Sequence, residues 1–211
     1  MCGRYQFSAD EYKEIRQIVR DAQRRSERNE LNFPMAGDIC PSQVAPVLVS
    51  RGEKIVGEFQ QWGLPGFRGR QQIINARAET VTEKPMFRRS IAFQRCVIPA
   101  TGFYEWDAVK HKYFFQMPGQ PIYLAGIYDN ISGVNCFIIL TTAPNDSVAP
   151  STTVCRCCSR TSRCARGWWT PVRRWNCFAA ARRCCCAQAV MGSWALMIWR
   201  ERVLWIKLRD L

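Results

Sequence analysis

The segment from Cys96 to Thr142 decides the fold, and it reads CVIPATGFYEWDAVKHKYFFQMPGQPIYLAGIYDNISGVNCFIILTT. It contains short runs of β-branched and aromatic residues separated by turn formers, a pattern typical of β-strands. Three similar runs precede it. The sequence predicts seven strands, at Ala45–Val49, Ile55–Trp62, Gln71–Thr80, Cys96–Trp106, Tyr113–Met117, Ile122–Tyr128 and Cys136–Thr142. With few helices between them, they predict an α+β fold in a single domain: a curled, mainly antiparallel, barrel-like sheet flanked by a few helices.

One amphipathic helix is predicted near the start of the chain, from Ser8 to Arg28. Ser8 is its predicted N-cap. The apolar residues that fall at helical spacing predict its buried face: Tyr12, Ile15, Ile18, Val19 and Ala22. The stretch Met1–Arg28 is polar and charged and does not resemble a secretory signal. The apolar run at 189–199 is about half of the roughly 20 residues that a membrane helix needs. We therefore expect a cytoplasmic protein without a membrane span.

Charge and cysteine content divide the chain near residue 150. Residues 1–150 carry 18 Lys and Arg against 15 Asp and Glu, whereas residues 151–211 carry 12 against 2. Most of the net charge of +13 therefore lies after residue 150, and only a modest excess before it indicates an anionic partner. The cysteines before residue 150 are too scattered to indicate a disulfide framework: Cys2, Cys40, Cys96 and Cys136.

Cys2 follows the initiator methionine, and removal of Met1 would leave an amine and a thiol on one residue. Such an amine can attack an aldehyde, because its pKa of about 8 leaves a neutral fraction near pH 7. The thiol can then close onto the imine to form a five-membered thiazolidine. Gly3 removes side-chain bulk beside this terminus, and Arg4 offers a cation for a phosphate. A cysteine in second position can equally be an accident of where the chain starts.

The sequence NARAET at residues 75–80 is a second candidate site segment. Strand alternation places Asn75, Arg77 and Glu79 on one face, with two alanines packed behind them. The alternative is a solvated strand face that carries an ordinary ion pair.

A third candidate segment is GFYEW at residues 102–106. Glu105 is a single carboxylate among three aromatic residues, where desolvation would raise its pKa and make it a proton donor or acceptor. The alternative is an edge strand with Glu105 pointing to water.

Five short motifs together resemble the SOS-response-associated peptidase family, whose members are also called abasic-site processing proteins. The resemblance runs from residue 1 to about residue 150, and five motifs in the family's order make coincidence a poor explanation. The motifs are Met1-Cys2-Gly3-Arg4, Pro41-Ser42-Gln43, Trp62-Gly63-Leu64, Asn75-Ala76-Arg77-Ala78-Glu79-Thr80 and Gly102-Phe103-Tyr104-Glu105-Trp106.

The resemblance implies a curled β-rich domain that senses abasic sites in single-stranded DNA and becomes covalently linked to the ring-opened sugar. By this resemblance Cys2 is the nucleophile, exposed by autocatalytic removal of Met1. Asn75 orients the terminus and the sugar, and Glu105 is the acid and base. The chemistry requires no metal and no organic cofactor, and the family pattern implies a monomer associated with the nucleoid.

The resemblance also implies a set of DNA-binding residues. Two match phosphate-binding positions, Arg4 and Arg77. Three are expected to line the DNA groove: Pro41, Trp62 and Met86.

The chain departs from the family after Pro150. The family continues with Ile-His-Asp-Arg-Met-Pro, whose histidine belongs to the active site, whereas this chain continues with STTVCR at residues 151–156. The single histidine is His111, in a lysine-rich turn that does not match the motif. We expect His111 to be a surface residue.

Residues 151–211 have the composition of a sequence translated in the wrong frame, with six of the eight Trp and eleven Arg against one Lys. Residues 149–158 can be back-translated with the codons GCA CCA TCC ACG ACC GTA TGC CGC TGC TGC. Read from the third base of the second codon, they encode Ile-His-Asp-Arg-Met-Pro-Leu-Leu. We therefore predict a truncated catalytic and DNA-binding domain over residues 1–150, followed by a frameshifted tail over 151–211 to which no domain is assigned.

Other interpretations stay open. Cys155, Cys158 and the run Cys184–Cys186 could form a zinc module, although structural zinc sites usually show two separated pairs. The basic tail could bind DNA. For the whole chain, the alternatives to a covalent trap are a non-catalytic single-stranded DNA-binding remnant that lacks the family histidine, and an N-terminal-nucleophile amide hydrolase.

Overall fold

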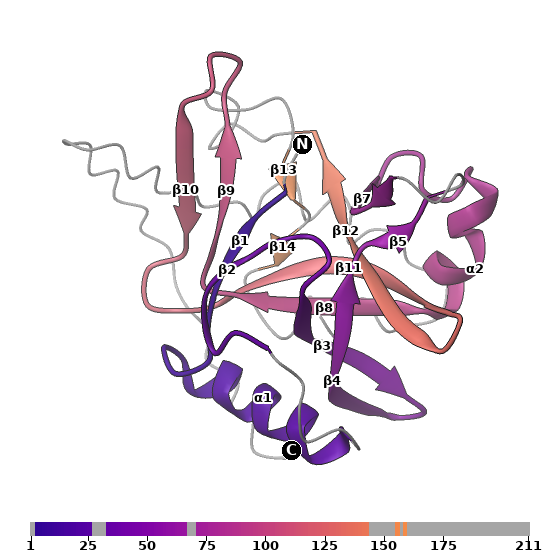
Figure 1. Ribbon diagram of the computed structural model, residues 1–211, viewed down its shortest axis with the longest axis horizontal. Helices are drawn as coiled ribbons and strands as arrows, with labels where there is room; N and C mark the ends of the chain where they lie inside the picture. Colours follow the sequence, from indigo (N-terminus) through magenta and orange to yellow (C-terminus); the bar gives the residue numbers. More distant parts are fainter. Residues whose placement is uncertain (1–2, 27–32, 67–70, 144–154, 157, 160–211) are drawn as a thin grey trace.

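The computed structural model describes residues 3–26, 33–66 and 71–143, and the backbone of residues 155–156 and 158–159. Two helices and fourteen strands lie within these ranges (Figure 1). The helices are α1 (Lys13–Arg25) and α2 (Pro85–Phe93). The strands are β1 (Tyr5–Ser8), β2 (Ala36–Ile39), β3 (Val44–Arg51), β4 (Lys54–Trp62), β5 (Leu64–Pro65), β6 (Gln72–Ile73), β7 (Asn75–Arg77), β8 (Arg95–Ala100), β9 (Gly102–Trp106), β10 (Lys112–Gln116), β11 (Ile122–Ile131), β12 (Val134–Thr142), β13 (Cys155–Arg156) and β14 (Cys158–Ser159).

Five long strands close into a barrel in the order β12, β4, β3, β8, β11, with β11 pairing back onto β12. All of these pairings are antiparallel except that between β4 and β12. A second, four-stranded antiparallel sheet in the order β10, β9, β1, β2 stands beside the barrel (Figure 1). The predicted α+β fold, with a curled and mainly antiparallel barrel-like sheet in one domain, is confirmed.

The apolar run at residues 137–140 lies in strand β12, where both faces of the strand are buried. Phe137 and Ile139 belong to the larger core cluster, which includes the barrel strands β3 and β8 and also β1. Ile138 and Leu140 belong to a second cluster with residues of α2. Because successive side chains of a strand point to opposite faces, a strand covered on both faces is apolar throughout instead of alternating.

The first helix is shorter than predicted, because α1 begins at Lys13 and not near Ser8. Ser8 is the last residue of β1 and pairs with Ala36 of β2, so the predicted N-cap is wrong. The sheet pairing of residues 5–8 prevails over the local capping preference of serine. The predicted buried face is confirmed for Ile15, Ile18, Val19 and Ala22, and Tyr12 is partly buried against the core.

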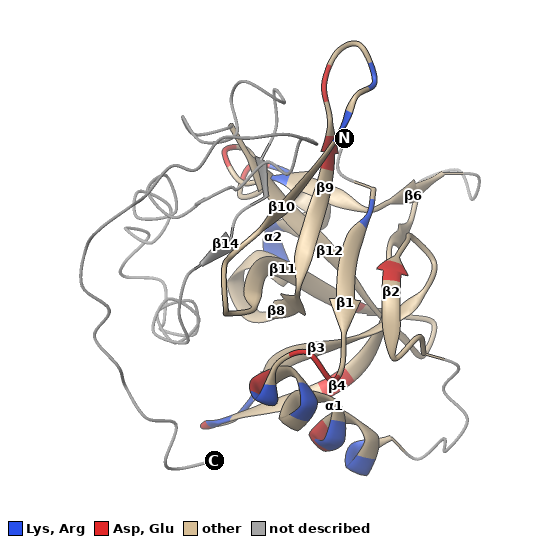
Figure 2. Ribbon diagram, turned by 90° about the vertical axis from the view of Figure 1, so that its left-hand side faces the viewer, with Lys and Arg blue, Asp and Glu red and all other residues tan. Residues whose placement is uncertain are grey.

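Helix α1 packs directly on strand β4, and a glycine makes the close approach possible. A β-carbon built on Gly57 would lie 2.5 Å from the carbonyl oxygen of Ile18. The amide N–H of Gly57 also donates a hydrogen bond of 2.8 Å to Asp21 Oδ2. The outer face of α1 carries interspersed acidic and basic residues (Figure 2).

Two predicted strands are each divided in two. Gln71–Thr80 becomes β6 and β7, separated at Ile74, and residues beyond Arg77 form a turn. Cys96–Trp106 becomes β8 in the barrel and β9 in the second sheet. The division falls at Thr101, whose N–H donates to the carbonyl oxygen of Gln6 in β1. The chain changes sheets there because β1 provides a new pairing partner.

Several elements were not predicted: β1, β2, β5, α2, and the short strands β13 and β14. The last two pair with β12 and β11 respectively, within the segment 151–211 to which the sequence assigned no domain. In the part of the chain that the structure describes, no helix is long and apolar enough to cross a membrane.

Candidate functional site

The candidate site lies where the beginning of β1 runs beside β9. Tyr5 pairs with Phe103 and Gln6 with Gly102, and the N–H of Tyr104 donates to the carbonyl oxygen of Arg4 at 3.3 Å. Extending this antiparallel register by two residues beyond Tyr5 would place Gly3 opposite Glu105. Met1 and Cys2 lie outside the described residues, and the candidate nucleophile is therefore located only through Gly3, its neighbour in sequence.

Glu105 is 1 % exposed and lies on the same face of β9 as the buried Phe103. Its cross-strand partner is Tyr113 of β10, and its Oε1 is shielded from solvent. Strand β9 is flanked by β10 and β1, so it is not an edge strand. The predicted burial of Glu105 is confirmed, and the alternative of an edge strand with the carboxylate pointing to water is wrong. Of the three aromatic residues beside it in sequence, only Phe103 lies on the same face of β9.

Asn75 begins strand β7, which runs parallel to β12 with Asn75 opposite Ile139. Its Oδ1 is also shielded from solvent. The preceding residue, Ile74, connects this strand to the start of the chain. A β-carbon built on Gly3 would lie 3.9 Å from Ile74 Cδ1. The structure therefore brings the first described residue of the chain next to the strand that carries Asn75.

The polar face predicted for residues 75–79 holds only as far as β7 extends. Ala76 is buried and Arg77 is exposed, as alternation requires. Glu79 lies in the turn after the strand, where its Oε1 accepts hydrogen bonds from Thr142 Oγ1 and the N–H of Ala143. Glu79 therefore holds the end of β12 instead of extending the face of β7.

Arg4 and Arg77 are both accessible to a ligand. Arg4 Nη1 lies 3.3 Å from Asp38 Oδ2, with 41 % of its side chain exposed. Tyr104 adjoins this ion pair, and burial raises the pKa of its hydroxyl group, as does Asp38, while Arg4 lowers it. Arg77 is exposed at the end of β7. Both guanidinium groups can meet a phosphodiester, although Arg4 would share its charge with Asp38.

The structure corrects one of the three groove-lining predictions. Trp62 is 0 % exposed, and its ring stacks on Phe137 at 6.3 Å between centroids. Its Nε1 donates to the carbonyl oxygen of Ile74 at 3.0 Å. The ring is thus a core residue that holds Ile74 in place, and it has no free surface for DNA. A large aromatic ring in a short motif does not by itself reveal whether it faces solvent.

Pro41 and Met86 are both partly buried, and they lie in different parts of the fold. Pro41 belongs to the turn before β3, where the N–H of Ser42 donates to the carbonyl oxygen of Trp62. Met86 lies on α2 and packs against the second core cluster. Their role in a DNA groove remains a prediction.

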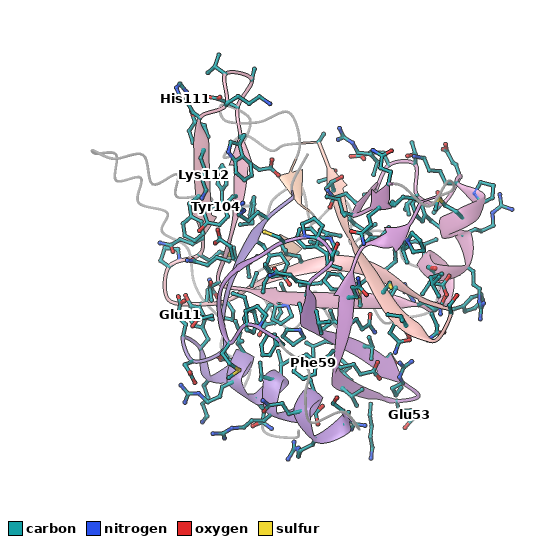
Figure 3. The ribbon with its side chains drawn as sticks, viewed as in Figure 1. Glu11, Glu53, Phe59, Tyr104, His111 and Lys112 are labelled. Carbon is teal, nitrogen blue, oxygen red and sulfur yellow. The ribbon has the colours of Figure 1, made fainter. Side chains whose placement is uncertain are left out.

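His111 is a surface residue, as predicted. It lies at the tip of the β9–β10 hairpin with 70 % of its side chain exposed (Figure 3). Its Nδ1 is 3.0 Å from Asp107 Oδ2. Asp107 also accepts the backbone N–H of His111, which makes the contact local to the hairpin turn.

Sequence reasoning missed Asp38, which the structure pairs with Arg4. The two residues are 34 positions apart, and Asp38 stands in the short strand AGDI, where Ile39 is the one strong strand former. Only the pairing of β1 with β2 brings them together, so no local signal could have identified Asp38.

Comparison of the sequence with models of protein families identifies the family of this chain. The model of the family described as "SOS response associated peptidase (SRAP)" matches residues 1–152. This chain belongs to the SRAP family. The resemblance expected from the five motifs is thereby confirmed.

Several curated proteins are similar to this SRAP chain. Abasic site processing protein YoaM of Bacillus subtilis is 35 % identical over 124 residues, which cover 52 % of this chain and 55 % of YoaM. Abasic site processing protein YedK of Escherichia coli is 25 % identical over 157 residues, which cover 70 % of each chain. The match to YoaM, like that to YoqW of Bacillus subtilis, spans only about half of the relative's length.

Two solved structures share the fold of the SRAP chain. A crystal structure of a protein from Bacteroides thetaiotaomicron has a TM-score of 0.64 at 24 % identity, covering 85 % of this chain and 86 % of the other. A phage-related protein from Bordetella bronchiseptica has a TM-score of 0.60 at 20 % identity, covering 86 % and 88 %. At these identities the likeness concerns the fold alone.

Proposed function

We propose that this SRAP chain senses abasic sites in single-stranded DNA and captures them covalently through Cys2 once Met1 has been removed. The relatives named as abasic site processing proteins support a role in the DNA damage response. The observation that carries the proposal is the register of β1 on β9, which leads the chain start toward the buried Glu105 and past Ile74, the neighbour of Asn75.

The proposed reaction joins the terminus to the aldehyde form of the abasic sugar. Removal of Met1 is hydrolysis of one peptide bond and consumes one water. The free amine of Cys2 attacks C1′ of the sugar, and loss of water gives an imine. The thiol then adds to the imine carbon as its proton passes to nitrogen, which closes a thiazolidine ring. No oxidant or reductant is needed.

Glu105 is proposed to move protons in this sequence. A carboxyl group with 1 % exposure is removed from bulk water, so a proton it holds or accepts stays within the site. It would assist opening of the sugar ring and loss of water from the first adduct. Asn75, with its shielded Oδ1, is proposed to orient the amine and the sugar.

Arg4 and Arg77 are proposed to hold the phosphates on either side of the lesion. Contacts of this kind position a strand and carry no sequence preference. That suits a lesion without a base. The proposed chemistry uses no metal and no organic cofactor.

Incubation of the full chain with an abasic single-stranded oligonucleotide, followed by denaturing electrophoresis, tests the proposal. We expect a band of reduced mobility that is absent for Cys2→Ala. Cys2→Ser keeps the amine and loses the thiol, so it should give only an adduct that becomes stable after reduction with borohydride. Mass spectrometry must find Met1 removed. Retention of Met1, or an undiminished adduct with Cys2→Ala, would refute the proposal.

A second function, binding of single-stranded DNA without covalent capture, is favoured by one observation. The single histidine of the chain is His111, which lies exposed at a hairpin tip and does not occupy the family motif. We propose that residues 151–211 are out of frame, which would remove the family histidine while leaving the described barrel. Native binding without a denaturation-resistant adduct would favour this function.

A further inference from the structure

We propose that the outward face of the β9–β10 hairpin is a stacking surface for the bases that flank the lesion in single-stranded DNA. This face, called here the outer strip, consists of Tyr104, Trp106, Lys112 and Phe114. The inference rests on the proposed function, because it assigns a place to the strand next to the captured sugar.

The outer strip is separated from the core by strand alternation. Phe103 and Glu105 of β9 and Phe115 of β10 are buried, and the residues between them point the other way. The pairs Tyr104 with Phe114 and Trp106 with Lys112 lie directly across the two strands. The three rings of the strip are only partly buried, and Lys112 is exposed.

The rings of the outer strip form a continuous row. The ring centroids of Tyr104 and Phe114 are 4.9 Å apart, and those of Tyr104 and Trp106 are 6.4 Å apart. Gly102 has no side chain where Phe114 lies over it, because a β-carbon built there would be 2.3 Å from Phe114 Cζ. Gly102 thus leaves room for the Phe114 ring against the backbone of β9. The Tyr104 ring is tilted by 41° to Phe114 and by 46° to Trp106, and the three rings together present an aromatic surface on which bases can stack.

Cations accompany the rings and match the charge of a nucleic-acid strand. Lys112 Nζ lies 3.9 Å from the centroid of the Tyr104 ring (Figure 3). Because its side chain is long and flexible, this ammonium group can move to a phosphate while a base takes its place on the ring. Lys110 stands at the hairpin turn, and Arg4 lies opposite Tyr104.

The acidic groups near the strip are already engaged. Asp38 is paired with Arg4, and Asp107 accepts hydrogen bonds from His111 and Tyr113. Figure 2 shows acidic and basic residues side by side at the turn of the β9–β10 hairpin. Interleaved rings and cations beginning at Arg4, two residues after the proposed nucleophile, favour single-stranded DNA over an apolar protein partner.

Fluorescence anisotropy of the full chain with labelled, undamaged thymidine oligonucleotides tests the inference. Lengths of about 5 and about 15 nucleotides bracket the range of a single-strand site. Trp106→Leu and Tyr104→Leu should each weaken binding of the longer strand by about 5- to 50-fold and leave the shorter strand nearly unaffected. Lys112 is exposed, so Lys112→Gln should leave the packing intact. It should make the negative slope of log K against log salt shallower by about 0.7.

Matched controls lie elsewhere on the surface. Phe93→Leu removes a ring that is 81 % exposed on α2, and Lys54→Gln removes an exposed cation at the β3–β4 hairpin. Neither should change the length dependence or the salt slope. Unchanged affinity for the longer strand in Trp106→Leu and Tyr104→Leu, with an unchanged slope in Lys112→Gln, would overturn the inference.

Covalent capture is measured on the same proteins with the shorter abasic strand. If the wild-type chain forms the adduct and the strip variants bind the longer undamaged strand as tightly as wild type, the stacking surface is refuted and the proposed function stands. Failure of the wild-type chain to form an adduct would refute covalent capture, while the length dependence of binding to undamaged DNA would still decide whether the strip contacts bases.

Discussion

Glu79 Oε1 accepts a hydrogen bond of 2.6 Å from Thr142 Oγ1, 63 residues further along the chain. The same oxygen accepts the N–H of Ala143 at 3.0 Å. Burial raises the pKa of Glu79, but these hydrogen bonds and the charge of Arg77 lower it, and the net pKa lies below the ordinary value. Because Thr141 pairs with Arg77, the end of β12 is held beside the strand that carries Asn75.

Replacement of Glu79 by glutamine should reduce stability in a pH-dependent way. The folded-state pKa is below the unfolded one, so the ionised carboxylate stabilises the fold above about pH 4.3, and this contribution is lost as pH falls through the folded-state pKa. Because Glu79 is exposed and solvent screens its charge, we expect Glu79→Gln to lower the free energy of unfolding by only about 0.5 kcal/mol near pH 7. Urea denaturation should show the difference shrinking near pH 3.

Glu53→Gln is the matched control, since Glu53 is exposed at the β3–β4 turn (Figure 3). It should not reproduce the effect. If the loss of unfolding free energy in Glu79→Gln grows as the pH falls, the ionised carboxylate of Glu79 is not the stabilising group.

Trp62 should behave as a core residue. Trp62→Ala removes a wholly buried ring and its hydrogen bond to Ile74, and should cost about 3 to 5 kcal/mol of unfolding free energy. Trp106→Ala removes a partly exposed ring and should cost about 1 kcal/mol. Guanidinium denaturation compares the two. Near-wild-type stability of Trp62→Ala combined with weakened DNA binding would show that the ring meets DNA after all.

Glu105 should be required for the rate of capture and not for binding. Glu105→Gln keeps the shape of the buried side chain but cannot exchange a proton, and should slow adduct formation by about 10²- to 10⁴-fold. Asp107→Asn, two residues along at the hairpin turn, should leave the rate unchanged. Single-turnover gel kinetics at saturating abasic strand measure both. An equal rate for Glu105→Gln and wild type would remove Glu105 from the proposed chemistry.

Restoring the reading frame after Pro150 should raise activity. The restored chain would carry the family's Ile-His-Asp-Arg-Met-Pro in place of STTVCR at residues 151–156. We expect capture about 10²- to 10⁴-fold faster than by the chain as written, because a positioned histidine supplies proton transfer. Resequencing the locus tests the origin of the tail. Equal rates for the two chains would show that this histidine is not needed.

Local patterns predicted the barrel strands because residues such as Val47 and Ile98 alternate or cluster in ways that only a buried sheet satisfies. They also predicted the buried face of α1. They failed at Ser8, which looks like a helix cap and is held in β1 by pairing with Ala36. They failed again at Trp62, because a motif shows that a ring is present but not which face of the sheet it occupies.

The sequence by itself determined the family, the strand-rich fold class and the chemical groups of the candidate site, since these depend on residue types in order along the chain. Only the tertiary structure decided that Glu105 is buried and that Gly3 lies beside Ile74. It alone also decided that Arg4 meets Asp38 across two strands. The physical reason is that these relationships arise from strand pairing between segments far apart in sequence, and the residues of one segment do not identify the distant strand with which it pairs.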